Sequence, residues 1–305
     1  MTREDFIPAL GRREPDSHKG TYGKLLFLAG SEGMTGAAIL AARAAYRAGA
    51  GLVAVGIDRR LFSAVSPAVP EAIFLDGGSW RRLLTSEVLG GFDAVLAGPG
   101  IGIEADRGLL RWLIERRRGP IVLDADALNI IAAARESFPL DSILAGRAET
   151  IWTPHPGEFE RLTGERPKGD AERLAAAERF VRRFGGVLVL KGHRTVVMDA
   201  ERSAVNASGN PGMATAGAGD VLSGMIAAFL GQGLAPFAAA RLAVHLHGRS
   251  GDIGAAELGE VSLTAGDLIE FLPRAIQEQF KTRKEPSRRH GPKRNGTKKK
   301  RVARA

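Results

Sequence analysis

The chain contains no cysteine among its 305 residues. This absence excludes disulfide frameworks, thiolate zinc sites and cysteine nucleophiles in any compartment. Histidine, aspartate, glutamate, serine, threonine and lysine are left to carry any chemistry. The composition is otherwise that of an ordinary globular protein, with 44% hydrophobic and 25% charged residues.

The sequence also lacks a secretory signal and a long apolar run. Residues Met1 to Asp5 include acidic side chains and no apolar signal core. The apolar stretch from Gly36 to Gly56 is interrupted by Arg43 and Arg47. It therefore falls short of the roughly 18 uninterrupted apolar residues that a membrane span needs. We expect a soluble, cytoplasmic protein with no membrane partner.

Most of the chain has no excess of positive charge. Residues 281–305 hold twelve of the 43 Lys and Arg residues and one of the 34 acids, so residues 1–280 carry 31 basic and 33 acidic side chains. The net charge of +9 thus arises in the tail, and the body has no basic excess that would indicate a nucleic-acid-binding fold. We predict that this tail is disordered. The tail is either a solvated extension or a segment that contacts nucleic acid or other acidic surfaces. Deleting it should leave turnover unchanged.

Short apolar runs alternate with helical patterns along residues 1–280. The runs are Leu25–Leu28, Leu52–Gly56, Ala94–Ala97, Ile121–Leu123, Thr150–Trp152 and Val187–Leu190, followed by a hairpin of Thr195–Met198 and Ser203–Val205. The helical patterns are Gly36–Ala48, Asp106–Arg117, Ala171–Phe184, Asp220–Leu230, Pro236–Ser250 and Ala265–Gln279. Unbroken apolar runs are typical of parallel strands that are buried on both faces. We therefore predict one α/β domain, a three-layer α/β/α sandwich with a mostly parallel central sheet, whose ligands bind at the carboxyl ends of the strands.

A glycine-rich segment, Asn206 to Asp220, precedes the helical pattern that starts at Asp220. Gly217 and Gly219 allow the backbone amides of Gly217, Ala218 and Gly219 to converge at a helix N-terminus, which forms an anion hole. A plain phosphate site gains nothing from a carboxylate beside it. Asp220 is therefore a candidate base that takes a proton from a hydroxyl as its oxygen attacks a phosphoryl group. The alternative is an ordinary loop in which Asp220 caps the helix.

Other polar clusters leave their roles open. Asp124, Asp126 and Asn129 follow a predicted strand and could hold a hydrated metal or act as cap and turn formers. His245 and His247 are two residues apart on a helical pattern, so they face different directions and are expected to be packing residues.

The segment Gly98 to Gly102 suggests a dinucleotide-binding turn, but Ile103 replaces its third glycine and the segment lies in the middle of the chain.

The motif Ala216-Gly-Ala-Gly-Asp220 resembles the signature of the ribokinase-like superfamily, in which the Asp is the catalytic base. Four further blocks narrow the resemblance: His18–Gly23, Asp124–Asn129, Thr153–Glu158 and Lys191–Thr195. Together with Asn206–Gly224, they resemble the ADP-dependent NAD(P)H-hydrate dehydratase family, in family order over roughly residues 5–275. Ala218 departs from the family pattern, which has Thr there, but it keeps the backbone donor.

The resemblance implies a ribokinase-like fold and a repair reaction. ADP would phosphorylate the S-form of hydrated NADH or NADPH (NADHX, NADPHX) on its hydroxyl, and phosphate would then leave, because phosphate is a better leaving group than hydroxide. The products would be NADH or NADPH, AMP and phosphate, with Mg²⁺ bridging the phosphates. The family also implies a homo-oligomer, and an epimerase for the other stereoisomer is expected on another chain.

The resemblance also implies specific binding residues. It assigns the nucleotide to Lys191, Gly192, His193, Arg194, Thr195 and Gly219, and the hydrated cofactor to Ala37, Gly102, His155 and Asp220. Glu158 matches an acidic position that related kinases use near Mg²⁺, often through water. Simpler roles remain possible: a solvated Lys191 in a turn, a half-buried His155, a Glu158 that favours the helix dipole, and helix packing by Ala37 and Ala38.

Two other functions remain open from the sequence alone. A kinase of the same fold would use ATP to phosphorylate an alcohol such as a vitamin precursor, and would release a stable phosphoester. A nucleotide-binding or nucleic-acid-binding protein without catalysis would bind RNA in a salt-sensitive way through the tail, even after Asp220→Asn.

Overall fold

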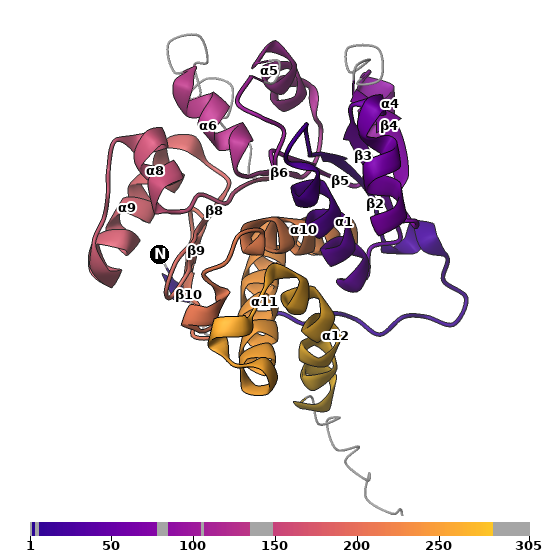
Figure 1. The fold of residues 1–305 in the computed structure, drawn as a ribbon. Coiled ribbons are helices and arrows are strands. Elements are labelled where there is room, and N and C mark those ends of the chain that lie inside the picture. Colours follow the sequence, from indigo (N-terminus) through magenta and orange to yellow (C-terminus); the bar gives the residue numbers. More distant parts are fainter. Residues whose placement is uncertain (1, 4–5, 78–84, 105–106, 135–148, 283–305) are drawn as a thin grey trace, which may run out of the picture.

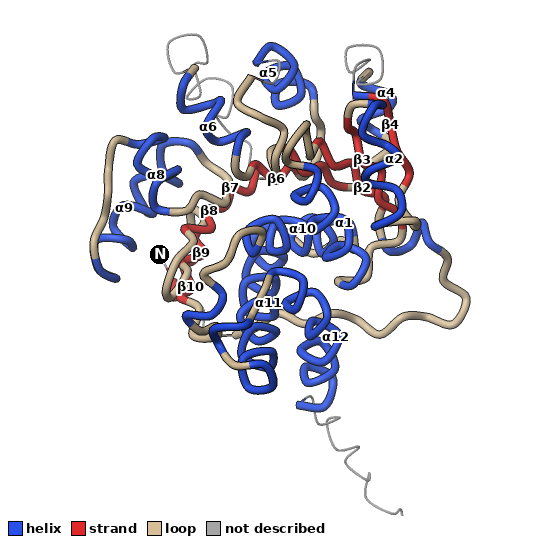
Figure 2. The backbone as a smooth tube through the Cα atoms, in the orientation of Figure 1, coloured by secondary structure: helices blue, strands red, loops and turns tan. Residues whose placement is uncertain are grey.

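The apolar runs pair into a ten-stranded sheet in the computed structural model, which describes residues 2–3, 6–77, 85–104, 107–134 and 149–282. Across the sheet the strands are β1 (Thr2–Arg3), β10 (Arg202–Val205), β9 (Val196–Met198), β8 (Val187–Leu190), β7 (Thr150–Trp152), β6 (Ile121–Leu123), β5 (Ala94–Ala97), β2 (Lys24–Leu28), β3 (Leu52–Ile57) and β4 (Ile73–Asp76). Strand β9 is antiparallel to both of its neighbours, and the other pairs are parallel. Figure 2 shows the strands, in red, running between the helices. The predicted hairpin margin and mostly parallel sheet are thus confirmed.

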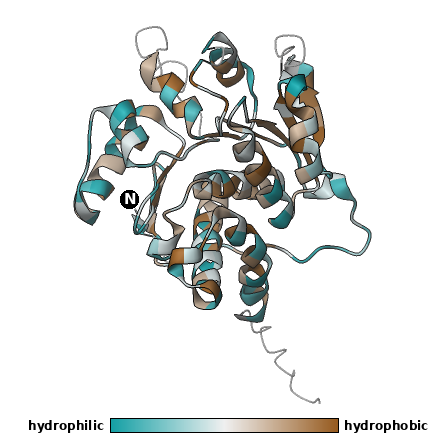
Figure 3. Cartoon of the chain, in the orientation of Figure 1, coloured by the Kyte–Doolittle hydropathy of each residue, from teal (hydrophilic) through white to brown (hydrophobic). Residues whose placement is uncertain are grey.

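Helices cover both faces of this sheet, which gives the predicted three layers (Figure 1). One face packs against α1 (Thr35–Arg47), α2 (Phe62–Val65), α10 (Ala218–Gly231), α11 (Pro236–Leu258) and α12 (Ala265–Thr282). The other packs against α4 (Ser86–Gly90), α5 (Arg107–Arg116), α6 (Asp126–Ala133), α8 (Pro156–Thr163) and α9 (Gly169–Phe184). The strands take the hydrophobic colour in Figure 3, whereas hydrophilic residues gather on the outer helices. Two buried clusters therefore hold the sheet between its helical layers.

Helix α11 runs eight residues beyond its predicted end at Ser250 and finishes at Leu258. Two glycines, Gly251 and Gly254, interrupt the apolar pattern there. A Cβ at Gly251 would lie 2.3 Å from Met213 Sδ, and one at Gly254 would lie 2.7 Å from Leu263 Cδ1. These glycines are thus sites of close packing within the helix and do not end it.

The C-terminal boundary also differs slightly from the prediction. Helix α12 includes Lys281 and Thr282, which were assigned to the tail. The rest of the predicted tail, residues 283–305, and Asp106 at the start of a predicted helix lie outside the described residues. Among the described residues, no helix combines the length and apolar character needed to cross a membrane.

The topology brings distant parts of the sequence to one edge of the sheet. Strands β6, β7 and β8 are adjacent and parallel, so the segments that follow them leave at the same edge. Helix α10 packs against β5 and β6 from one side. The polar segments that follow Leu123, Trp152 and Leu190 therefore meet near the first turn of α10.

Candidate active site

The first turn of α10 has the geometry of an anion site. Gly217 is the N-cap in the left-handed conformation, with φ 88°, and the helix begins at Ala218. The amides of the first turn have no partners within the helix, and the helix dipole is positive there. Asp220 is the third residue of the helix, so the alternative in which it acts as the N-cap is wrong.

Asp220 is a half-buried carboxyl group with unusually high proton affinity. Its pKa is raised to about 7, first by burial and then by the charge of Asp124, while Lys191 lowers it. A base is most effective when its pKa lies near the working pH. Asp220 is therefore suited to exchange a proton at neutral pH.

Lys191 lies directly after β8 and is largely buried, so the solvated alternative is wrong. Its Nζ is 2.8 Å from Asp124 Oδ1 and 3.8 Å from Glu158 Oε2, and its side chain is 17% exposed. Burial opposes the charge on Lys191, but the two carboxylates outweigh it and raise the pKa of the lysine. The ammonium also lies close to the first turn of α10, since a Cβ built on Gly219 would be 3.2 Å from Nζ.

The turn after β6 holds Asp124 and Asp126 in different roles. Asp124 is 1% exposed, and its Oδ2 has no hydrogen-bond partner among the described residues. Asp126 Oδ2 accepts a hydrogen bond of 2.9 Å from the amide of Gly102. Between them, Ala125 has φ 50° and ψ −118°, a region that costs a non-glycine residue about 1 to 3 kcal/mol. The turn thus keeps a strained backbone while presenting both carboxylates at the site.

His155 caps α8 together with Glu158. The ring Nδ1 accepts hydrogen bonds from the amides of Gly157 and Glu158, at 3.0 and 3.3 Å, so the proton of the neutral ring is on Nε2. Glu158 Oε2 in turn accepts from the His155 amide at 2.8 Å. Burial, and then the Lys191 charge, lower the pKa of His155, whereas burial raises that of Glu158.

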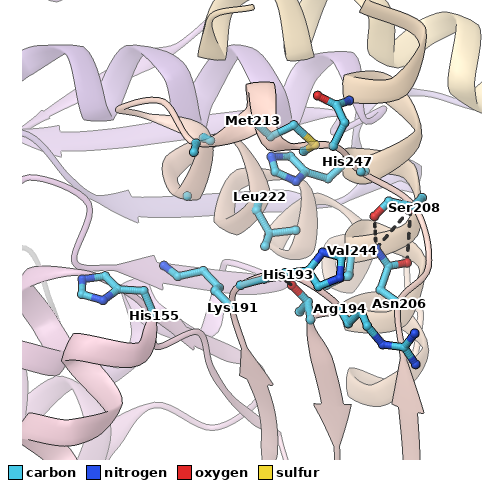
Figure 4. A pocket seen from close by; sticks show the side chains of 18 of the residues that line it. His155, Lys191, His193, Arg194, Asn206, Ser208, Met213, Leu222, Val244 and His247 are labelled. Carbon is cyan, nitrogen blue, oxygen red and sulfur yellow. Dashed lines mark hydrogen bonds between the residues drawn. The ribbon is translucent and has the colours of Figure 1, made fainter. Parts of the chain in front are cut away.

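A cavity of about 640 Å³ opens beside these groups. Its lining includes every residue predicted to bind the nucleotide: Lys191, Gly192, His193, Arg194, Thr195 and Gly219. His155 and Lys191 lie at one end, and Asn206 and Ser208 lie at the other, joined by hydrogen bonds (Figure 4). The cavity therefore extends from the charged cluster toward more apolar walls that include Leu222 and Val244.

Two further residues have roles at or near this cavity that the sequence did not predict. His247 lies on the wall, with its Nε2 unpartnered among the described residues, and burial lowers its pKa to about 4. It is thus a neutral wall residue, where the sequence predicted only packing.

Arg173 on α9 donates to the carbonyl oxygen of Leu190 at 2.9 Å and also to that of His193. Nothing in its amphipathic helical pattern indicates that it fastens the segment after β8.

Ala37 and Gly102, predicted to contact the hydrated cofactor, lie outside the lining of this cavity. Ala37 lies against Gly100, since a Cβ built on Gly100 would be 2.9 Å from Ala37 Cβ, whereas a Cβ built on Gly102 would be 3.6 Å from Ser31 Oγ. Ala38 is fully buried, so the packing alternative holds for Ala38, whereas Ala37 is partly exposed. Gly102 reaches the charged cluster through its hydrogen bond to Asp126.

The charged cluster does not form a protein cage for a metal. Within the described residues, no three His, Asp or Glu side chains gather as metal ligands. Glu158 is already engaged with His155 through both oxygens, at 2.8 and 3.3 Å. Mg²⁺ usually keeps several waters and binds substrate phosphates with one or two carboxylates. The residues therefore fit a magnesium ion that nucleotide phosphates would carry.

The fold and this site define an α/β protein of the ribokinase-like class, in which a helix N-terminus with the geometry of an anion site lies next to the half-buried carboxyl group of Asp220. Comparison with known proteins identifies the family. The family model for NAD(P)H-hydrate dehydratase matches residues 25–274. The chain therefore belongs to the NAD(P)H-hydrate dehydratase family, as the sequence motifs predicted.

Individual relatives agree with this assignment. The chain is 40% identical over 262 residues to the ADP-dependent (S)-NAD(P)H-hydrate dehydratase of Neisseria meningitidis, covering 84% of this chain and 86% of that one. It is 41% identical over 287 residues to the bifunctional NAD(P)H-hydrate repair enzyme of Moorella thermoacetica. That match covers 90% of this chain, which spans about half (53%) of the relative's length.

A solved structure shows a similar arrangement. The ADP/ATP-dependent NAD(P)H-hydrate dehydratase of Bacillus subtilis, co-crystallised with ATP and Mg²⁺, matches with a TM-score of 0.75 and 32% identity. The match covers 89% of this chain and 95% of that one.

Proposed function

We propose that this chain catalyses the ADP-dependent dehydration of the S-form of hydrated NADH and NADPH, with release of AMP and phosphate. The observation that carries the proposal is the pairing of a helix N-terminus that has the geometry of an anion site with the half-buried carboxyl group of Asp220, whose pKa is raised to about 7, beside a cavity of about 640 Å³. The relatives named for this activity, including one of nearly the same length, support it.

In the proposed reaction, the nucleotide occupies the cavity and its terminal phosphate meets the amides at residues 217–219 and the Lys191 ammonium. Asp220 takes the proton of the substrate hydroxyl as its oxygen attacks the terminal phosphorus of ADP, and AMP leaves. The C–O bond then breaks with phosphate as the leaving group, and a proton leaves the neighbouring carbon. This restores the double bond of the reduced nicotinamide, so the net change is loss of water from the substrate and hydrolysis of ADP.

Mg²⁺ bound to the phosphates would supply positive charge that offsets the negative charge building up during transfer. Ala37, Gly102 and His155 are the proposed contacts of the hydrated cofactor. Gly102 has no side chain to keep the cofactor away from the backbone. His155 presents a neutral ring, since its pKa is lowered.

The test is to incubate the purified protein with hydrated NADH, Mg²⁺ and either ADP or ATP, and to follow the returning near-ultraviolet absorbance of NADH. We expect recovery with ADP that is lost in Asp220→Asn. No recovery with either nucleotide would refute the dehydratase proposal. A stable phosphoester formed from an alcohol and ATP would instead indicate a ribokinase-like small-molecule kinase.

A further inference from the structure

The buried ion pair between Lys191 and Asp124 has a role that the proposed chemistry does not yet include. We propose that Asp124 is a positioning residue, whose carboxylate holds the Lys191 ammonium beside Gly219 and Asp220, where the phosphate-binding turn meets the base. The inference rests on the proposed phosphoryl transfer and adds to it a residue that touches neither substrate in that scheme.

Three independent features of the structure support this role. The contact between Lys191 Nζ and Asp124 Oδ1 is 2.8 Å long, and the carboxylate is 1% exposed. The second oxygen of Asp124 has no partner among the described residues. The neighbouring Ala125 has the strained φ of 50°. A strained turn that buries an incompletely paired carboxylate is costly to the fold, and such costs are typical of functional sites.

The position of Lys191 follows from its other neighbours. Glu158 Oε2 is farther away, at 3.8 Å, and is already bonded to the His155 amide. Asp124 is thus the dominant anchor of the ammonium. Without it, Lys191 is expected to move toward the remaining carboxylates, Glu158 and Asp220.

Asp220 would respond to both partners, but in opposite directions. The charge of Asp124 raises the pKa of Asp220, and that of Lys191 lowers it. Two further carboxylates act in the same direction as Asp124: Asp126 on α6 and Glu158 on α8.

The other elements packed against α10 contribute less. On α11, His247 is neutral because burial lowers its pKa to about 4. On α1, Arg43 and Arg47 are paired with Glu270 of α12. The ion pair of Asp124 and Lys191 therefore offers a clear test, because removing one partner should lower the pKa of Asp220 and removing the other should raise it.

The experiment measures the titration of Asp220 directly, by NMR of protein labelled with ¹³C at the aspartate carboxyl groups. The Asp220 signal is assigned by its loss in Asp220→Asn. In Asp124→Asn, removal of the negative charge should lower the pKa of Asp220 by about one unit, a tenfold change in its acid dissociation constant. In Lys191→Met the pKa should rise by a similar amount. Glu270→Gln, on the outer helix α12, serves as the control and should leave the titration unchanged.

Turnover supplies a second, separable readout. Asp124→Asn should lower kcat about tenfold and shift the acid limb of the pH profile to lower pH, with a smaller effect on the KM for ADP. Lys191→Met should raise the KM for ADP about tenfold or more and shift the acid limb to higher pH. If Asp124→Asn does not fold, the test uses two variants of Lys191 instead. Lys191→Met should shift the acid limb, and the conservative Lys191→Arg should return it to the wild-type pH.

An Asp220 titration that is the same in wild type, Asp124→Asn and Lys191→Met would overturn the inference. So would an Asp124→Asn variant that loses stability but keeps the wild-type pH limb, because that result indicates a structural role only. Since the NMR titration requires no turnover, it also separates the two proposals. Shifted titrations without conversion of hydrated NADH would refute the dehydratase function and leave the positioning role intact.

Discussion

Two ion pairs in this molecule have contacts of the same length in very different surroundings. Lys191 and Asp124 are 2.8 Å apart, with side chains 17% and 1% exposed. Arg43 and Glu270 are also 2.8 Å apart, but their side chains are 41% and 49% exposed. The attraction between unit charges at one distance grows several-fold as water is removed, and so does the cost of leaving one charge alone. The effect of breaking either pair therefore depends on its burial more than on its contact length.

The buried pair lies where the chemistry is proposed, and the exposed pairs join α1 to α12 on the outside. The comparison predicts that changes near Lys191 alter turnover, proton affinity and stability together. Changes at Glu270 should alter none of them much.

Asp220→Asn removes the proposed base of the charged cluster while keeping the shape of the side chain. We expect kcat to fall by about 10² to 10⁴, the usual contribution of a general base. Binding of ADP, measured by calorimetry, should be retained because the amides of the first turn remain. A variant with wild-type kcat would show that Asp220 is not the base.

Lys191→Met leaves Asp124 buried without its cation. Breaking a buried pair in this way should lower the free energy of unfolding by about 3 to 5 kcal/mol. Denaturant unfolding of the variant and of wild type measures the difference. The double variant Lys191→Met with Asp124→Asn should recover part of the loss, and failure to recover any would contradict the pairing argument.

Gly217→Ala tests the backbone of the proposed anion site. The left-handed φ of 88° disfavours alanine, and the added Cβ would be 2.4 Å from Leu40 Cδ1. We expect a loss of stability of about 1 to 3 kcal/mol and weaker ADP binding. Gly233→Ala is a matched control, because that glycine also has a positive φ but no heavy atom near the added Cβ. Equal effects on ADP binding in both variants would argue against an anion site at Gly217.

The pH profile should show the proton affinity of Asp220. The ionised carboxylate is the active form of the proposed base, so kcat should fall about tenfold per unit as the pH drops below the pKa of about 7. His247, with its pKa lowered to about 4, stays neutral in this range and should add no limb. An acid limb near the ordinary aspartate value would show that Asp220 is not raised as described.

Glu270→Gln removes the partner of two exposed arginines on α1. Exposed pairs contribute about 0 to 1 kcal/mol, so the melting temperature should change little and turnover should not change. A truncation that ends at Thr282 should likewise keep full turnover. A large loss in either protein would show that the outer surface matters more than the comparison allows.

Much of the fold could be predicted from the sequence, because its parallel strands are buried on both faces. Ala94–Ala97, Ile121–Leu123 and Val187–Leu190 are strands with the predicted bounds. Strand β4 was missed, since it lies at the sheet edge and is only partly buried. Its short sequence, Ile-Phe-Leu-Asp, gives no clear pattern by itself.

The site was predictable where its residues are contiguous in sequence. The turn before α10 and the segment 191–195 each form one local unit, and both lie on the cavity wall. The pairing of Lys191 with Asp124 joins residues 67 positions apart and depends on the order of the strands. No local pattern contains that information, so the role of Asp124 could be inferred only from the structure.

The most direct test of the account follows both products of one reaction. Hydrated NADH, ADP and Mg²⁺ are incubated with wild type and with Asp220→Asn, and NADH and inorganic phosphate are quantified together. Wild type should release one phosphate for each NADH recovered, and the variant should form both products about a hundredfold or more slowly. Recovery of NADH without phosphate release, or equal rates for the two proteins, would contradict the account.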